Sequence, residues 1–177
     1  CTDENMADPE KYNAFCSRFD IDNLIDYAIL EGYSGNTDLK YNVKLFKSSD
    51  SDNKWRFVFY DLDKAFFETA GVMRPVFEEY AKPCSELTLM LRSLMKNDEF
   101  KDKFLTRFSQ AIKSTLSDEN LISVIDDIYY QIQPEMERDR KHVCISYSYW
   151  EKCVDHLRAF ARDEHYAQSA INNICRI

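Results

Sequence analysis

Glycine, proline and histidine are scarce in this sequence, and their scarcity limits which folds and which metal sites are possible. Three glycines and four prolines among 177 residues leave few helix breakers, so long helices are favoured. No His-x-x-x-His or Cys-x-x-Cys spacing occurs, which argues against a zinc site or a thioredoxin-type redox motif. No apolar run approaches the length of a membrane span.

Positive charge is also in deficit. Lys and Arg number 23 against 31 Asp and Glu, which gives a formal net charge of -8. An acidic surface repels nucleic-acid phosphates and anionic lipid headgroups, so neither partner is expected.

The cysteines are irregularly spaced and leave two interpretations open, free thiols or one or more disulfides. They are Cys1, Cys16, Cys84, Cys144, Cys153 and Cys175.

Hydrophobic periodicity predicts a mainly helical α+β fold with one β-hairpin. Asp20 is placed to cap a helix with an apolar stripe, and Gly32 and Gly35 are expected to end it. Two segments rich in β-branched and aromatic residues flank a polar turn, which predicts a hairpin at residues 42–60.

The rest of the sequence, after residue 84, has helical periodicity throughout. We expect helices over residues 85–96, 98–112, 117–129, 134–142, 148–163 and 165–175. No linker composition interrupts this pattern. We therefore expect a polar, partly ordered lead-in at 1–18 and a single domain at 19–177.

Polar residues with a possible chemical role concentrate between residues 36 and 63. Asp38 and Asn42 precede the predicted hairpin, whereas Asp61 and Asp63 follow its second strand. Antiparallel strands place the start of one beside the end of the other, so these side chains are expected to converge. Carboxylate and amide oxygens suit Mg²⁺ or Mn²⁺. The alternative is that they are ordinary turn residues, because Asp and Asn are common in turns.

Several segments, in this order, resemble the CotH family, the spore-coat-protein-H-like atypical kinases. They are residues 19–27 (FDIDNLIDY), 35–38 (GNTD), 42–46 (NVKLF), 55–63 (WRFVFYDLD), 94–100 (LMKNDEF) and 132–139 (IQPEMERD). The resemblance covers roughly residues 19–175. It implies the helical C-lobe of a kinase-like fold.

The resemblance also implies residue roles. Asp38 matches the Asp that engages the substrate hydroxyl, and Asp61 matches the metal-binding Asp that contacts the nucleotide through the ion. Asn42 is assigned as a second metal and nucleotide ligand, and Asp63 as a supporting metal residue. The implied cofactor is ATP with Mg²⁺ or Mn²⁺, and the implied partner is a secreted, cell-surface or spore-coat protein with Ser or Thr acceptors.

The chain also departs from a complete kinase pattern. Nothing before Asp20 resembles a Gly-rich loop, a strand lysine or its glutamate partner. We therefore expect the chain to be the C-terminal part of the domain, inactive without its N-lobe. Two functions stay open: a fragment of a Ser/Thr protein kinase, or a non-catalytic assembly module of a spore coat or cell surface.

Overall fold

The structure is a computed structural model, and it describes residues 5–39, 42–66, 86–143, 146–163 and 172. Within these residues the chain forms six helices and one two-stranded antiparallel sheet, which confirms the predicted α+β class. The chain divides into two compact units, residues 1–108 with 166–177 and residues 109–165, and each is described by itself. None of the described helices is both long and apolar enough to cross a membrane.

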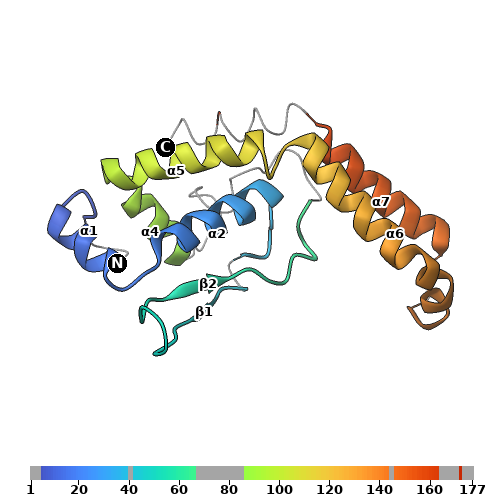
Figure 1. Cartoon of the computed structure of the whole chain (residues 1–177), viewed down its shortest axis with the longest axis horizontal. Coiled ribbons are helices and arrows are strands. Elements are labelled where there is room, and N and C mark those ends of the chain that lie inside the picture. The colour runs from blue at the N-terminus through green and yellow to red at the C-terminus, as the bar shows by residue number, and fades with distance from the viewer. Residues whose placement is uncertain (1–4, 40–41, 67–85, 144–145, 164–171, 173–177) are drawn as a thin grey trace. The chain divides into compact units, whose positions relative to one another are not determined.

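Helix α2 (Ile21–Ser34) organises the first unit (Figure 1). The Asp20 carboxylate accepts a hydrogen bond from the Asn23 amide and caps the helix, as predicted. Gly35 ends the helix with a left-handed φ of 62°, also as predicted. Gly32 lies inside the helix, so the expectation that it helps to end α2 was wrong. Its neighbours complete the hydrogen-bonded turn up to Gly35, and a single interior glycine costs a helix only about 1 kcal/mol.

The hairpin consists of β1 (Lys44–Phe46) and β2 (Arg56–Val58), within the predicted range. The strands pair antiparallel with Leu45 opposite Phe57. Asn23 of α2 bonds both backbone groups of Phe57, accepting from its N–H at 2.6 Å and donating to its carbonyl at 3.2 Å. The buried Phe57 ring also stacks on Tyr27 at 5.0 Å. These contacts attach β2 to α2, which determines where the chain after β2 emerges.

The N-terminal segment contains a helix that the sequence analysis did not predict, α1 (Pro9–Cys16). Asp8 caps it, and Pro9 occupies the first helical position, where no N–H is needed. Tyr12 and Phe15 on this helix are buried, so the segment contributes to the core. Cys16 in α1 and Cys153 are free thiols; the other four cysteines lie outside the described residues.

Helices α4 (Glu86–Leu94) and α5 (Asp98–Lys113) supply the rest of the described core of the first unit. Phe100 and Phe104 of α5 and Leu91 of α4 are fully buried. Ion pairs also join α5 to α2: Arg107 binds Asp26 through two hydrogen bonds of 2.8 and 2.6 Å. Both predicted helices are confirmed, because burial follows their helical spacing.

The second unit is built on α6 (Asp118–Val143) and α7 (Tyr147–Ala161) (Figure 1). Tyr129 of α6 stacks on Trp150 of α7 at 5.0 Å, and Arg158 of α7 pairs with Asp126 of α6. We expected two helices, 117–129 and 134–142, but α6 is continuous through Pro134. Proline removes one helical hydrogen bond, and the flanking turns and the packing on α7 maintain the helix. The helix expected at 165–175 lies outside the described residues apart from residue 172.

Candidate functional site

The candidate site is formed by two loops, one following α2 and one following β2. The Phe66 amide donates to the Ser34 carbonyl at 2.7 Å, and the Thr37 amide donates to the Lys64 carbonyl at 3.4 Å. These bonds tie the segment containing Asp38 to the segment that begins at Asp61. The two backbone segments therefore lie side by side through loop-to-loop bonds, and convergence of the Asp38 and Asp61 side chains stays a prediction.

Asp38 and Asn42 lie in the first loop and contact each other. The Asn42 side-chain nitrogen donates to Asp38 Oδ2 at 3.3 Å, and both residues are half-buried. The Asn42 backbone amide also donates to the Leu39 carbonyl at 3.1 Å. A side-chain amide binds metal ions through its oxygen, and the bond from the Asn42 nitrogen to Asp38 leaves that oxygen available.

Asp61 lies just beyond β2 with an exposed side chain and a positive φ of 60°. Positive φ is uncommon for a residue with a Cβ, and such strain concentrates at functional sites. Asp63 is exposed as well, and its carboxylate is 3.7 Å from Lys64 Nζ. Asp61 begins the segment that is hydrogen-bonded to the Asp38 loop. Asp63 contacts the adjacent residue, Lys64.

A buried asparagine, which the sequence analysis did not single out, connects the two loops. Asn36 has no exposed surface. Its side-chain oxygen accepts the Asp38 N–H at 3.1 Å, and its side-chain nitrogen reaches the Asp61 carbonyl at 3.5 Å. The same nitrogen donates to Glu31 Oε2 at 2.9 Å. One side chain thus contacts the backbone of both candidate catalytic aspartates.

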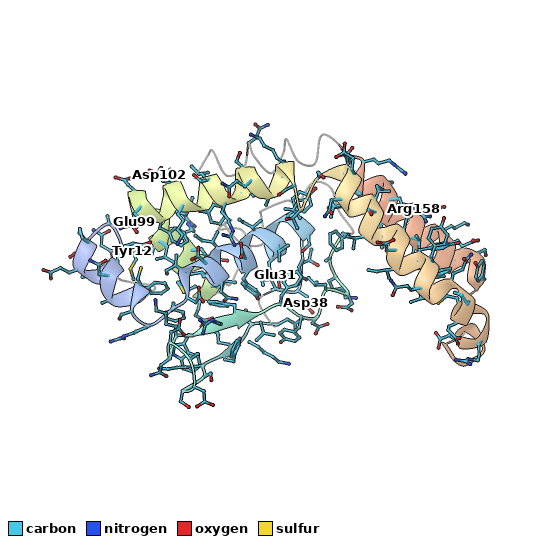
Figure 2. All side chains as sticks on the ribbon, in the orientation of Figure 1. Tyr12, Glu31, Asp38, Glu99, Asp102 and Arg158 are labelled. Atoms are coloured by element: carbon cyan, nitrogen blue, oxygen red, sulfur yellow. The ribbon has the colours of Figure 1, made fainter. Side chains whose placement is uncertain are left out.

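Glu31 belongs to α2 and is also fully buried; Figure 2 labels it together with Asp38. Burial raises the pKa of Glu31, and the hydrogen bond from Asn36 opposes that rise. Tyr27, whose pKa is also raised by burial, interacts electrostatically with Glu31. The geometry between them falls short of a regular hydrogen bond, so Glu31 Oε1 and the Tyr27 hydroxyl are buried without one.

The sequence does contain a signal for Glu31. It follows the apolar Leu24 and Ala28 at helical spacing, so a charged residue stands on the buried face of α2. Charged residues on such a face are rare unless they have partners. The signal predicts a buried polar contact, but it does not reveal that Asn36 is the partner.

The donor atoms suit a hard divalent cation. Asp61 offers an exposed carboxylate and Asn42 an amide oxygen, and Mg²⁺ in nucleotide sites is held by one or two carboxylates together with phosphates and water. In the part of the chain that the structure describes, no three His, Cys, Asp or Glu side chains lie close enough to hold a metal ion together. Among the described residues, Asp38, Asp61 and Asp63 therefore do not form a three-carboxylate metal site by themselves.

Comparison with known proteins assigns the family. The family model described as CotH kinase protein matches residues 3–166, which is nearly the whole chain. The match begins before α1, so the N-terminal segment belongs to the matched region. No curated protein and no solved structure gave a significant match. The sequence motifs and the extent of the match agree, and the chain belongs to the CotH kinase protein family.

Proposed function

We propose that this chain carries the phosphoryl-transfer residues of a protein kinase that moves phosphate from ATP to Ser or Thr. One observation supports this most strongly. Asn36 contacts the backbone of both Asp38 and Asp61, so the two aspartates to which the family resemblance assigns the catalytic and metal-binding roles are linked by one hydrogen-bonded side chain.

Asp38 is proposed to orient the acceptor hydroxyl. The hydroxyl oxygen attacks the γ-phosphorus of ATP, the bond from this phosphorus to the β,γ-bridging oxygen breaks, and ADP leaves. Asp38 Oδ1 or Oδ2 takes the hydroxyl proton. The hydrogen bond from Asn42 to Oδ2 holds the carboxylate in one orientation, and positioning of this kind supplies much of the rate in phosphoryl transfer.

Asp61 and the Asn42 side-chain oxygen are the residues proposed to hold Mg²⁺ or Mn²⁺. When bound there, the ion would neutralise charge on the nucleotide phosphates. Asp63 is proposed to support the metal ion indirectly, by adding negative charge beside Asp61 without binding the ion itself. Its exposure and its distance from Lys64 are compatible with a supporting role.

The substrate and the nucleotide anchor are proposed from family membership. Family membership favours a secreted, cell-surface or spore-coat protein as the substrate and the same location for the enzyme. Nothing before Asp20 resembles a Gly-rich loop or the strand lysine of a kinase N-lobe. We propose that residues beyond these 177 anchor the nucleotide, and that the chain alone does not transfer phosphate.

Calorimetric titration of the full-length protein with Mg²⁺ and a non-hydrolysable ATP analogue tests the site. Asp61→Asn is expected to weaken binding of the metal–nucleotide complex by about tenfold or more, which is ~1.4 kcal/mol. Asp50→Asn is a matched control, because Asp50 is an exposed residue of the hairpin turn and the change is chemically identical. Equal affinity in all three proteins would show that Asp61 is not a metal ligand.

A further inference from the structure

We propose that Asn36 is a positioning residue that sets the placement of Asp38 relative to Asp61, and that buried Glu31 determines which way its amide points. This inference rests on the proposed function and adds two residues to the site. Neither residue reaches the substrate, because both side chains are fully buried. Their effect on catalysis therefore passes through the backbone of Asp38 and Asp61.

The direction of the Asn36 amide follows from its neighbours. Glu31 Oε2 is an acceptor, so the Asn36 side-chain nitrogen faces it at 2.9 Å. The Asn36 oxygen is then left to accept the Asp38 N–H at 3.1 Å. The reversed amide would place oxygen against a carboxylate oxygen and its NH₂ group against an N–H. Both contacts would be repulsive between buried groups.

This orientation does not depend on the charge of Glu31. A protonated Glu31 with its proton on Oε1, the oxygen without a hydrogen bond, keeps Oε2 as an acceptor for Asn36. The Asp38 N–H and the Asp61 carbonyl favour the same direction, so removal of the Glu31 acceptor weakens this preference and loosens the amide. The backbone supports the same arrangement, since the Asn36 N–H donates to the Glu31 carbonyl at 3.3 Å.

Glu31 is costly to the fold, which points to a purpose other than stability. Glu31 Oε1 and the Tyr27 hydroxyl are buried and interact in a geometry that falls short of a regular hydrogen bond, and poorly satisfied buried atoms destabilise a protein. An apolar side chain of similar length would remove that cost. Sites that sacrifice stability in this way are frequently functional, because optimising them for stability lowers activity.

The test compares Glu31→Met with Glu31→Gln in the full-length protein. Methionine removes the acceptor, whereas glutamine retains one and is the matched control. We expect Glu31→Met to melt at the wild-type temperature or above it. We also expect its Asp38 amide to exchange with solvent about tenfold faster or more, and its kcat for phosphoryl transfer to fall about 10- to 100-fold. Glu31→Gln is expected to retain a protected Asp38 amide and a kcat near the wild-type value.

A second variant keeps the proposal testable if Glu31→Met does not fold. In the double variant Glu31→Gln with Asn36→Asp, the donor and the acceptor of this hydrogen bond exchange places. The Asp38 N–H keeps an acceptor, but the Asp61 carbonyl loses its donor. We expect a protected Asp38 amide together with about tenfold lower kcat.

Three results would overturn the positioning role, and a fourth bears on the proposed function. An Asp38 amide that exchanges equally slowly in wild type and Glu31→Met would overturn the positioning role, as would full kcat in the double variant. A kcat that follows the melting temperature in every variant would also overturn it, because a structural role predicts that pattern. A wild type without any phosphoryl transfer refutes the proposed function instead, and the exchange measurement still decides whether Glu31 orients Asn36.

Discussion

Asp61 has a positive φ of 60°, and two substitutions there separate its backbone role from its carboxylate. Asp61→Gly and Asp61→Ala both remove the carboxylate, but only glycine adopts this φ without steric cost. The cost for a residue with a Cβ is about 1–2 kcal/mol. The greater freedom of glycine in the unfolded chain offsets about 0.5–1 kcal/mol. We therefore expect Asp61→Gly to exceed Asp61→Ala in free energy of unfolding by about 0.5–1 kcal/mol.

The control is the same pair of substitutions at Asp102, an exposed residue inside α5 (Figure 2). Glycine in a helix interior is less stable than alanine by about 1 kcal/mol, so the order of the two variants reverses. Urea denaturation followed by circular dichroism measures both differences. Both Asp61 variants should also lose metal–nucleotide binding to the same extent. Asp61→Ala as stable as or more stable than Asp61→Gly would refute the argument that the backbone is strained at this position.

Two further predictions concern stability. Asn97 caps α5 by accepting the Phe100 N–H and donates to the Met6 carbonyl, both at 3.0 Å. Asn97→Ala should cost about 2 kcal/mol from the lost cap and the lost tie to the N-terminal segment, seen as a fall of about 4–8 °C in Tm. Asn13→Ala, on the exposed face of α1, should leave Tm within about 1 °C, and equal shifts would contradict the capping role. Burial raises the pKa of Glu31 above its usual 4.5, so the folded chain retains that proton to higher pH than the unfolded chain. Wild type should therefore lose stability relative to Glu31→Gln as the pH rises from about 4.5 through the folded pKa, and parallel curves in urea denaturation would contradict this.

Local rules predicted much of the fold because the deciding interactions lie close together in the sequence. The Asp20 cap and the Gly35 terminus of α2 each depend on a few neighbouring residues. The hairpin depends on two β-rich segments around a polar turn. Local rules did not predict that α6 continues through Pro134, because proline by itself tends to end a helix and the packing of α6 against α7 outweighs that tendency. Helix α1 was also not predicted, because its few apolar residues give too weak a helical pattern, and their burial is visible only in the folded chain.

In the candidate site, too, some residues could be found from the sequence and others only from tertiary contacts. Asp38, Asn42 and Asp61 were found from residue type, order and resemblance, and the structure places their loops together through hydrogen bonds. Their catalytic and metal-binding roles stay predictions. Asn36 and Glu31 were missed because their importance lies in a tertiary contact between a helix and two loops. The sequence held two signals, the charge on the apolar face of α2 and the place of Asn36 in the family-like segment 35–38, but neither identifies the contact between them.

The central claim is that this site transfers phosphate from ATP. Its most direct test is transfer of labelled γ-phosphate by the full-length protein, with Mg²⁺ or Mn²⁺ and dephosphorylated casein as acceptor. We predict label on Ser or Thr with wild type and with the Asp50→Asn control. Asp38→Asn should lower the rate by about 10²- to 10⁴-fold, because it removes the group that takes the hydroxyl proton. Transfer by Asp38→Asn at the wild-type rate would contradict the account.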